Sequence, residues 1–328
     1  MASSSNKGIA ILFVLWVLTL LSIIAGEFCY TMRTELKITS NFKEETQGYY
    51  IALAGYYKAI FELIKKEDDT NIKNTSNKDD ENNIEWRINS DLPFISFESG
   101  IFKVRIENES GKININKAQG GTLKLLLKNF DISDKEKDII VDSILDWRDK
   151  DNLHRINGAE DDYYQTVLTP YECKDDDFDS IEELLLVRGV TSALFCELKD
   201  IITVYGDSSP VININQPQNK GFDYNKININ AAHRELLSCL PGITDEKVEE
   251  ILEFRKSKDF KNFAELFSIL GSEYYTSVTP YITFDLLPYY TIISQGNITN
   301  SKAKGQVRVL IKINKAIDEK FKVVQWYS

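Results

Sequence analysis

Carboxylates gather in two stretches near the middle of the chain. They are "DWRDKDNLHRINGAEDDYY" (146–164) and "YECKDDDFDSIEE" (171–183). Between residues 149 and 183 there are 12 acidic and 3 basic residues, a net charge of −9, against −11 for the whole chain. Ca²⁺ takes about six to eight oxygen ligands, commonly from clustered Asp and Glu and from loop carbonyls. We therefore consider a calcium site with these candidate ligands: Asp149, Asp151, Glu160, Asp161, Asp162, Asp175, Asp177 and Asp179.

Neither acidic stretch has the spacing of an EF-hand. Leu153 occupies the third ligand position of the first stretch, and Ser180 stands where the second would need glycine. Spacing alone favours a solvated acidic loop. The density of carboxylates favours a metal, because like charges crowded into an ordered loop require a counter-charge. Both interpretations stay open, and the metal interpretation predicts one or two structural calcium ions.

Other site chemistry has less support. Four cysteines without a C-x-x-C motif, together with two histidines, argue against zinc. Cys173 and Cys196 would pair in an oxidising compartment or remain free thiols. Glycosidases use two carboxylates across a cleft, but the sequence has no nucleophile elbow and no glycine-rich phosphate loop. We expect no enzymatic activity, and a membrane-anchored hydrolase is a competing interpretation.

The acidic residues lie within a repeated unit. "KININKA" (112–118) recurs as "KININAA" (226–232), with "VININQP" (211–217) between them. Each outer copy precedes a region with helical periodicity. The first repeat covers about 112–206 and carries an acidic insertion at 149–183, whereas the second covers about 226–284 and lacks it. The sequence therefore predicts two related helical units.

Each repeat contains a stretch similar to a helix–hairpin–helix. "LPGITDEKVEEIL" (240–252) is the stronger and "VRGVTSALFCEL" (187–198) the weaker. Hairpins of this kind often bind DNA phosphates through backbone amides. Here Thr244 fills the second glycine position, and four carboxylates that follow it would repel phosphate. We expect structural hairpins and no nucleic-acid partner.

The N-terminus holds an apolar helix. Ile9 to Gly26 contains 18 residues without a charge, a helix of roughly 27 Å that would cross a hydrocarbon core. Residues 1–8 are small and polar and end in glycine, as expected of a leader cut before Ile9. No proline interrupts residues 9–66, so one long helix is predicted, followed by a polar loop from residue 67.

Strands are expected on both sides of the helical repeats. Residues 67–111 comprise the polar loop and then alternating apolar and polar residues, and residues 287–328 alternate likewise. The pattern predicts an α+β protein in which an α-helical domain, residues 112–286, is inserted into an antiparallel sheet.

These motifs resemble the minor pseudopilin K family of type II secretion. The resemblance rests on Gly8 before the apolar helix, "YYIALAGYYKAI", "ILDWRDKDN…NGAEDDYY", "FDSIEELLLVRGV" and "ITVYGD…VININ". It implies a pilin-like fold, a leader (1–8) cut after Gly8 by prepilin peptidase, and a methylated mature N-terminus at Ile9. A membrane segment (9–26) and a periplasmic helix (27–66) would follow, giving a single-pass inner-membrane protein. It also implies calcium in the inserted domain.

The same resemblance implies a position at the pseudopilus tip with minor pseudopilins I and J. Phe13 stands at mature position five, where most pilin-like subunits have a glutamate, and a tip subunit has no neighbour ahead whose amine needs that charge. Partner contact is expected through apolar positions of the long helix: Tyr49, Leu53, Tyr56 and Ile60. The competing interpretation is a minor pilin of a type IV pilus or DNA-uptake system.

Overall fold

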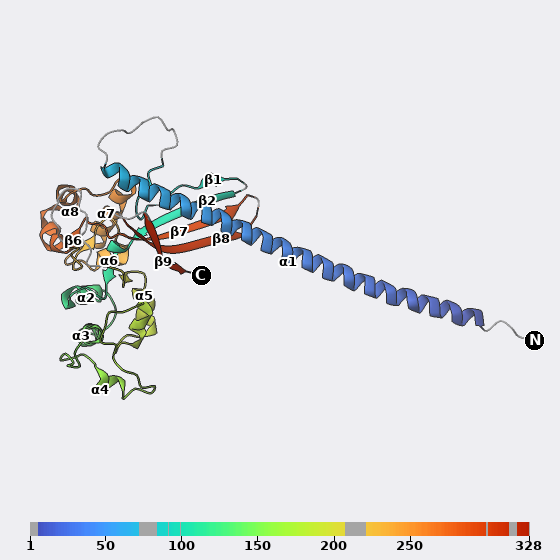
Figure 1. Cartoon of the computed structure of the whole chain (residues 1–328), viewed down its shortest axis with the longest axis horizontal. Coiled ribbons are helices and arrows are strands. Elements are labelled where there is room, and N and C mark those ends of the chain that lie inside the picture. The colour runs from blue at the N-terminus through green and yellow to red at the C-terminus, as the bar shows by residue number, and fades with distance from the viewer. Residues whose placement is uncertain are drawn as a thin grey trace, which may run out of the picture. The chain divides into compact units, whose positions relative to one another are not determined.

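The chain begins with one long helix, α1 (Asn6–Asn71) (Figure 1). The computed structural model describes residues 6–71, 84–90, 92–98, 100–206, 221–299, 301–314 and 320–327. Among these, one helical stretch, Ile9–Lys65, is long and apolar enough to cross a membrane, with a window of mean hydropathy 2.7 that is wholly unburied. The continuous helix predicted from the absence of proline is confirmed.

A five-stranded sheet forms the β part of the described chain. Its strand order is β1-β2-β7-β8-β9, with β1 antiparallel to β2 and β8 antiparallel to β9. The strands are β1 (Ile95–Phe97), β2 (Gly100–Asn108), β7 (Tyr289–Ile298), β8 (Lys304–Ile313) and β9 (Phe321–Tyr327). Because β2 and β7 are neighbours, all the elements between them in sequence are an insertion. The predicted α+β class, with helices inserted into an antiparallel sheet, is confirmed.

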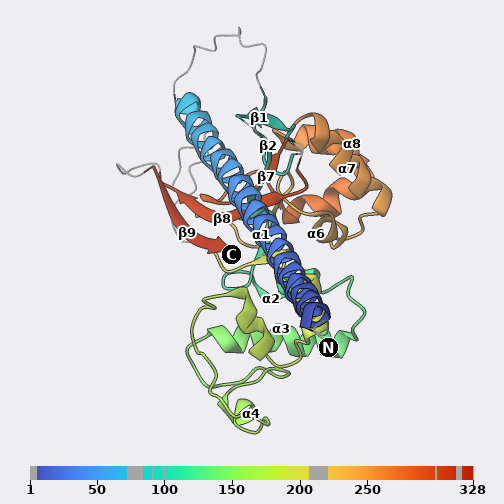
Figure 2. The same cartoon turned by 90° about the vertical axis from the view of Figure 1, so that its right-hand side faces the viewer.

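The inserted part holds two groups of helices, which can be told apart in both views (Figures 1 and 2). The first group follows η1 (Glu109–Gly111) and contains β3 (Ile113–Asn114), α2 (Gly120–Leu126), α3 (Asp134–Arg148), α4 (Asp161–Tyr164), η2 (Ile181–Leu186), α5 (Ser192–Leu198) and β4 (Ile202–Thr203). The second contains β5 (Ile227–Asn228), α6 (Arg234–Ser238), α7 (Asp245–Ser257), α8 (Phe263–Val278), η3 (Thr279–Tyr281) and β6 (Ile282–Thr283). One buried hydrophobic cluster, from Ile113 to Ile282, contains residues of both groups.

The two groups repeat the same local structure. In each, the first short strand pairs in parallel with the last, β3 with β4 and β5 with β6. Each hairpin has a glycine in the left-handed region, Gly189 (φ 87°) and Gly242 (φ 72°). In each, a threonine two residues later, Thr191 or Thr244, caps the next helix. The third sequence copy, 211–217, lies outside the described residues.

The prediction of a partner surface on α1 is wrong in part, because some of the predicted residues are buried in the protein itself. Tyr56 and Ile60 are only 1% and 4% exposed, and Leu53 is half-buried. The Tyr56 ring packs edge-on against Trp326, with ring centroids 5.5 Å apart, and burial raises its pKa to about 12. These residues belong to the protein's own core. Of the four predicted positions only Tyr49, at 38%, is exposed.

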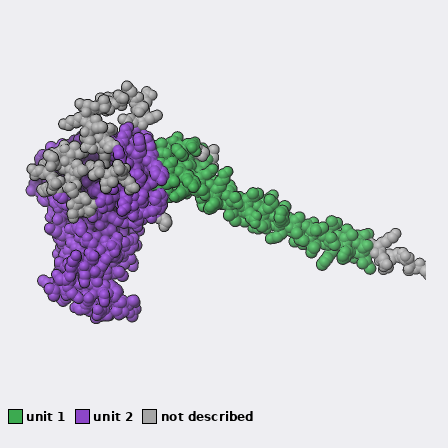
Figure 3. All heavy atoms as spheres, in the orientation of Figure 1, with its two compact units in different colours: residues 1–55, 94–103, 294–307 green, residues 56–93, 104–293, 308–328 purple. Residues whose placement is uncertain are grey.

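The chain divides into two compact units (Figure 3). The first comprises Met1–Gly55, Phe94–Lys103 and Ser294–Val307, and the second the remaining residues. In the first unit the α1 backbone touches the backbone of β7 and β8 at three glycines. A Cβ on Gly305 would lie 2.2 Å from the carbonyl carbon of Gly48, and one on Gly296 would lie 2.3 Å from the Gly48 oxygen. Only glycine permits this approach, since no backbone atom can yield to a side chain.

Replacing Gly305 by alanine should separate helix and sheet and destabilise the protein by about 1–3 kcal/mol. The matched control is Gly121→Ala in α2, where an added Cβ would meet nothing within 4 Å and the substitution should be neutral or stabilise by up to ~1 kcal/mol. Thermal unfolding of the full-length chain in detergent measures both. Equal melting temperatures for the two variants would contradict the contact.

Candidate metal centre

An asparagine side chain closes each helical repeat in the same way. Asn116 donates its amide to the Phe178 carbonyl (2.9 Å) and accepts from the Phe178 N–H (2.7 Å). Asn230 does the same with Phe260, at 2.9 and 2.8 Å. Each of these asparagines is the second of the repeated "NIN" motif. The motif therefore determines where the chain is bound when it returns after the long helix.

An arginine and an aromatic ring at the end of that helix complete the closure. Arg148 of α3 donates to the carbonyls of Ile115 and Ala118, and Arg255 of α7 donates to that of Ala232. The preceding rings, Trp147 and Phe254, stack on the two phenylalanines, with centroids 6.2 and 4.2 Å apart.

The two repeats differ in how the chain travels from arginine to phenylalanine. In the second repeat only residues 256–259 intervene, whereas in the first residues 149–177 do. This longer connection contains most of the acidic insertion. Its two ends are held by the same contacts as the short one, so the site described next is built on a loop with fixed ends.

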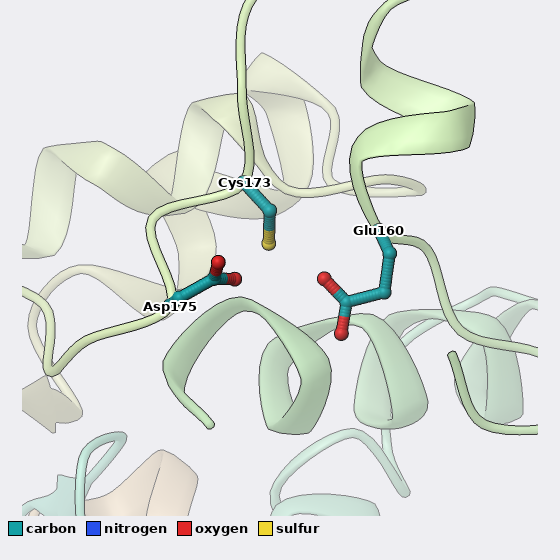
Figure 4. A group of neighbouring side chains, drawn as sticks. All are labelled: Glu160, Cys173 and Asp175. Carbon is teal, nitrogen blue, oxygen red and sulfur yellow. The ribbon is translucent and has the colours of Figure 1, made fainter. Parts of the chain in front are cut away.

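Three side chains of this loop point toward one another (Figure 4). They are Glu160, directly before α4, and Cys173 and Asp175 from the returning part of the loop. One ligand atom of each lies within 4.8 Å of the others. Glu160 is 1% exposed, Cys173 is buried and Asp175 half-buried. Asp175 adopts φ 52°, a left-handed conformation that is uncommon outside glycine.

Several carboxylate oxygens of the loop are buried without a partner. Neither oxygen of Glu160 is paired with a basic side chain or a backbone N–H, and one oxygen of Asp175 and one of Asp149 also lack such a partner. A buried, unpaired carboxylate is costly, and proteins normally pair it or use it to coordinate a metal. The donor set of carboxylate oxygens around a shared space fits a divalent cation such as Ca²⁺.

The electrostatics point the same way. Burial raises the pKa of Glu160 to about 7, with the Cys173 thiol opposing the rise and the charges of Asp146, Asp175 and Asp149 adding to it. Burial, and then Glu160, raises the pKa of the Cys173 thiol. Without a cation, this centre therefore disfavours negative charge.

Two predicted ligands support the centre from its edge. Asp149 uses one oxygen in an ion pair with Arg155 (2.6 Å) and leaves the other free. Asp161 accepts the Cys173 N–H at 2.7 Å and the Asn152 amide at 3.1 Å, which fixes the position of the cysteine.

The remaining predicted ligands are occupied elsewhere. Asp151 and Asp162 are exposed and accept nearby backbone N–H groups. Asp177 pairs with Lys117 at 2.6 Å, and Asp179 with Lys174 at 2.8 Å. Of the eight predicted residues, the structure thus brings Glu160 and Asp175 together, with Asp149 and Asp161 adjoining.

Two residues of the centre were missed from the sequence. Asp146 is fully buried and pairs with Arg155, and a Cβ on Gly158 would collide with its carboxylate. Cys173 was considered only for a disulfide. The structure holds it as a free thiol, as it does the exposed Cys196, so the two form no bridge. The available signal for Cys173 was its place just before the acidic run 175–177.

Comparisons with known proteins show what this chain is similar to. Residues 103–207 match the family "Type II secretion system (T2SS), protein K", and residues 223–283 match "Helix-hairpin-helix motif". Type II secretion system protein K of Aeromonas hydrophila is 27% identical over 63% of this chain and 66% of its own length. The protein of the same name from Pseudomonas aeruginosa is 23% identical over 82% of this chain and 79% of its own length.

A solved structure shares the fold. It is the crystal structure of the GspK-GspI-GspJ complex from the type 2 secretion system of enterotoxigenic Escherichia coli. The match has a TM-score of 0.54 at 16% identity and covers 86% of this chain and 98% of the matched chain. The resemblance to protein K of type II secretion is therefore confirmed, as is the helix–hairpin–helix in the inserted helices.

The raised pKa of Glu160 predicts how stability depends on pH in the absence of metal. Between its ordinary pKa of 4.5 and about 7, the folded protein binds more protons than the unfolded chain. The free energy of unfolding should therefore fall as the pH rises from about 5 to about 8. Glu160→Gln should remove this contribution, whereas Asp162→Asn should retain it. Melting curves in EDTA across this range test it, and an identical pH dependence in Glu160→Gln and the parent would contradict it.

Proposed function

We propose that this chain, a relative of protein K of type II secretion, is a non-enzymatic minor pseudopilin at the tip of the pseudopilus. There it would help to initiate or cap the fibre for protein export across the outer membrane. The observation that carries the proposal is the combination of an apolar N-terminal helix with a sheet that a family-matched helical insertion interrupts. In this proposal the helix anchors the chain in the inner membrane and the rest lies in the periplasm.

The N-terminal residues support a tip position. Phe13 has no charge to offer the terminal amine of a subunit ahead, which is best tolerated where none lies ahead. The size of the insertion argues likewise, since subunits along a fibre pack side by side. Cleavage by prepilin peptidase after Gly8, with Ile9 as the methylated first residue, remains a prediction from the sequence.

The partner surface on α1 is an aromatic stripe. Tyr50, Tyr57 and Phe61 are 62%, 57% and 58% exposed, and their spacing of seven and four residues places them on one face of the helix. This face replaces the predicted Tyr56 and Ile60. We propose that it packs against the helices of minor pseudopilins of the I and J types, the kind of complex in which the structural relative was solved.

We further propose that calcium binds at the centre formed by Glu160, Cys173 and Asp175, called the Glu160 centre below, and stabilises the inserted helices. Glu160 and Asp175 would supply ligand oxygens, and Asp149, whose charge acts on Glu160, has one carboxylate oxygen without a hydrogen bond. A divalent cation would neutralise the carboxylates that now lack partners. It would also join the outgoing and returning halves of the long loop.

Calcium should raise the melting temperature of the full-length protein in detergent. A ligand at roughly 100 times its Kd adds about 2.7 kcal/mol, which corresponds to roughly 5–10 °C for a domain of this size. Glu160→Gln should lose most of this rise, and the exposed Asp162→Asn should keep it. Equal melting temperatures in calcium and in EDTA would return the acidic residues to the solvated-loop interpretation.

A charge in the aromatic stripe should weaken the assembly. Phe61→Glu should lower the affinity for I- and J-type partners by about 10–100-fold, because burying a phenylalanine side chain in the interface contributes roughly 1.5–3 kcal/mol. The matched control is Phe94→Glu, since Phe94 is similarly exposed at 56% but lies outside α1. Co-purification from membranes of cells that express all three subunits measures the complex. Equal loss with both variants would exclude a specific role for the stripe, and failure of the parent to co-purify would exclude the proposed assembly.

A further inference from the structure

The Glu160 centre contains a sulfur atom that calcium does not use. Ca²⁺ is a hard cation with oxygen ligands, whereas a thiolate is a ligand for zinc and other softer metals. Figure 4 shows the sulfur of Cys173 directed between the carboxylates of Glu160 and Asp175. The centre therefore has a mixed donor set.

We propose that Glu160, Cys173 and Asp175 together bind a borderline-soft divalent metal, zinc in the first place, with the Cys173 thiolate as a ligand. Zinc would compete with calcium for the same two carboxylates. This inference rests on the metal site proposed above and adds to it the sulfur ligand and a second class of metal. It also revises the expectation, drawn from the missing C-x-x-C motif, that zinc has no site here.

The distances suit such a metal. Zinc bonds of about 2.3 Å to sulfur and about 2.0–2.2 Å to carboxylate place tetrahedral ligand atoms roughly 3.3–3.8 Å apart. The three ligand atoms already lie within 4.8 Å of one another without a metal. Three protein ligands leave the fourth position to water. The Glu160 carboxylate is 99% buried and is paired with no basic side chain or backbone N–H, which is the independent sign that the group faces a cation.

The other buried cysteine shows that this placement is not a general property of buried thiols here. Cys239 is buried too, but its sulfur contacts the carbonyl oxygens of Leu126 and Glu235, at 3.6 and 3.3 Å. Among the described residues, Cys173 belongs to the one group of side chains whose ligand atoms converge in this way. Its backbone N–H is held by Asp161, which keeps the sulfur in position.

Metal binding by Cys173 requires no oxidant or reductant. The S–H bond breaks, the proton passes to solvent, and the sulfur lone pair forms the bond to zinc. The metal remains divalent throughout. With calcium in the same place the thiol keeps its proton, so the two metals differ in whether Cys173 is ionised.

Cobalt(II) is a spectroscopic probe for zinc, because cobalt–thiolate bonds give a charge-transfer band in the near ultraviolet. The full-length protein, in detergent and with Cys29 and Cys196 replaced by serine, is stripped with EDTA, freed of chelator and titrated with Co²⁺. We expect the band to saturate at one equivalent and to disappear when Zn²⁺ is added. Cys173→Ser should abolish it, and Cys239→Ser is the matched control that should keep it.

The affinities separate this inference from the calcium proposal. Cys173→Ser should weaken zinc binding by roughly 10–100-fold or more and change the calcium concentration at half-stabilisation by less than about twofold. A calcium effect without a cobalt–thiolate band would overturn the sulfur ligand and leave the calcium site standing. A band that survives in Cys173→Ser would also overturn it. Loss of both metals in Glu160→Gln, with retention of both in Asp162→Asn, would support it.

Discussion

The paired hydrogen bonds between an asparagine amide and the backbone of a phenylalanine organise the inserted helices. Asn116 holds Phe178, and Asn230 holds Phe260, with both backbone groups satisfied in each case. Because the ends of the connection are fixed by these bonds and by the stacked rings, the length between them is free to vary at little entropic cost. In the first repeat this connection is a long acidic loop. The candidate metal centre therefore depends on the asparagine–phenylalanine contact, which contains no acidic residue.

Some carboxylates of this loop are paired with basic side chains and others are not. The unpaired carboxylates mark the position of the candidate metal centre. Arg155, Lys117 and Lys174 neutralise acidic residues around its edge, among them Asp146, Asp149, Asp177 and Asp179. Glu160 and Asp175 have oxygens that no such cation reaches. A fully solvated loop would leave its carboxylates in water, where they need no partner. Here Glu160 is buried, so the unbalanced charge lies where water cannot compensate it.

The sequence predicted those features that depend on local pattern. An uninterrupted apolar and then amphipathic run predicted α1, alternation predicted the outer strands, and a repeated motif predicted the paired helical units. What it could not provide was the partner of each side chain. Periodicity marks Tyr56 and Ile60 as apolar positions but does not say whether the protein's own core or another subunit covers them. Charge density likewise does not distinguish among the eight predicted ligands. Asp177, for example, pairs with Lys117, and the sequence does not reveal this pair because the two residues are distant along the chain and meet only in the fold.

The two sides of α1 are divided by residue size. Gly48, Ala52 and Gly55 are buried on one side, where Gly296, Gly305 and Ser294 of the sheet approach the helix backbone. At 100° per residue, Tyr50 and Tyr57 stand two positions, or about 200°, from Gly48 and Gly55 and so face the opposite way. The side of α1 with the small residues packs against the sheet. This close backbone contact leaves no room there for a second protein. Any helix that docks on α1 in this region must therefore meet the aromatic side, where large, rigid and exposed rings offer the most apolar area for a partner to bury.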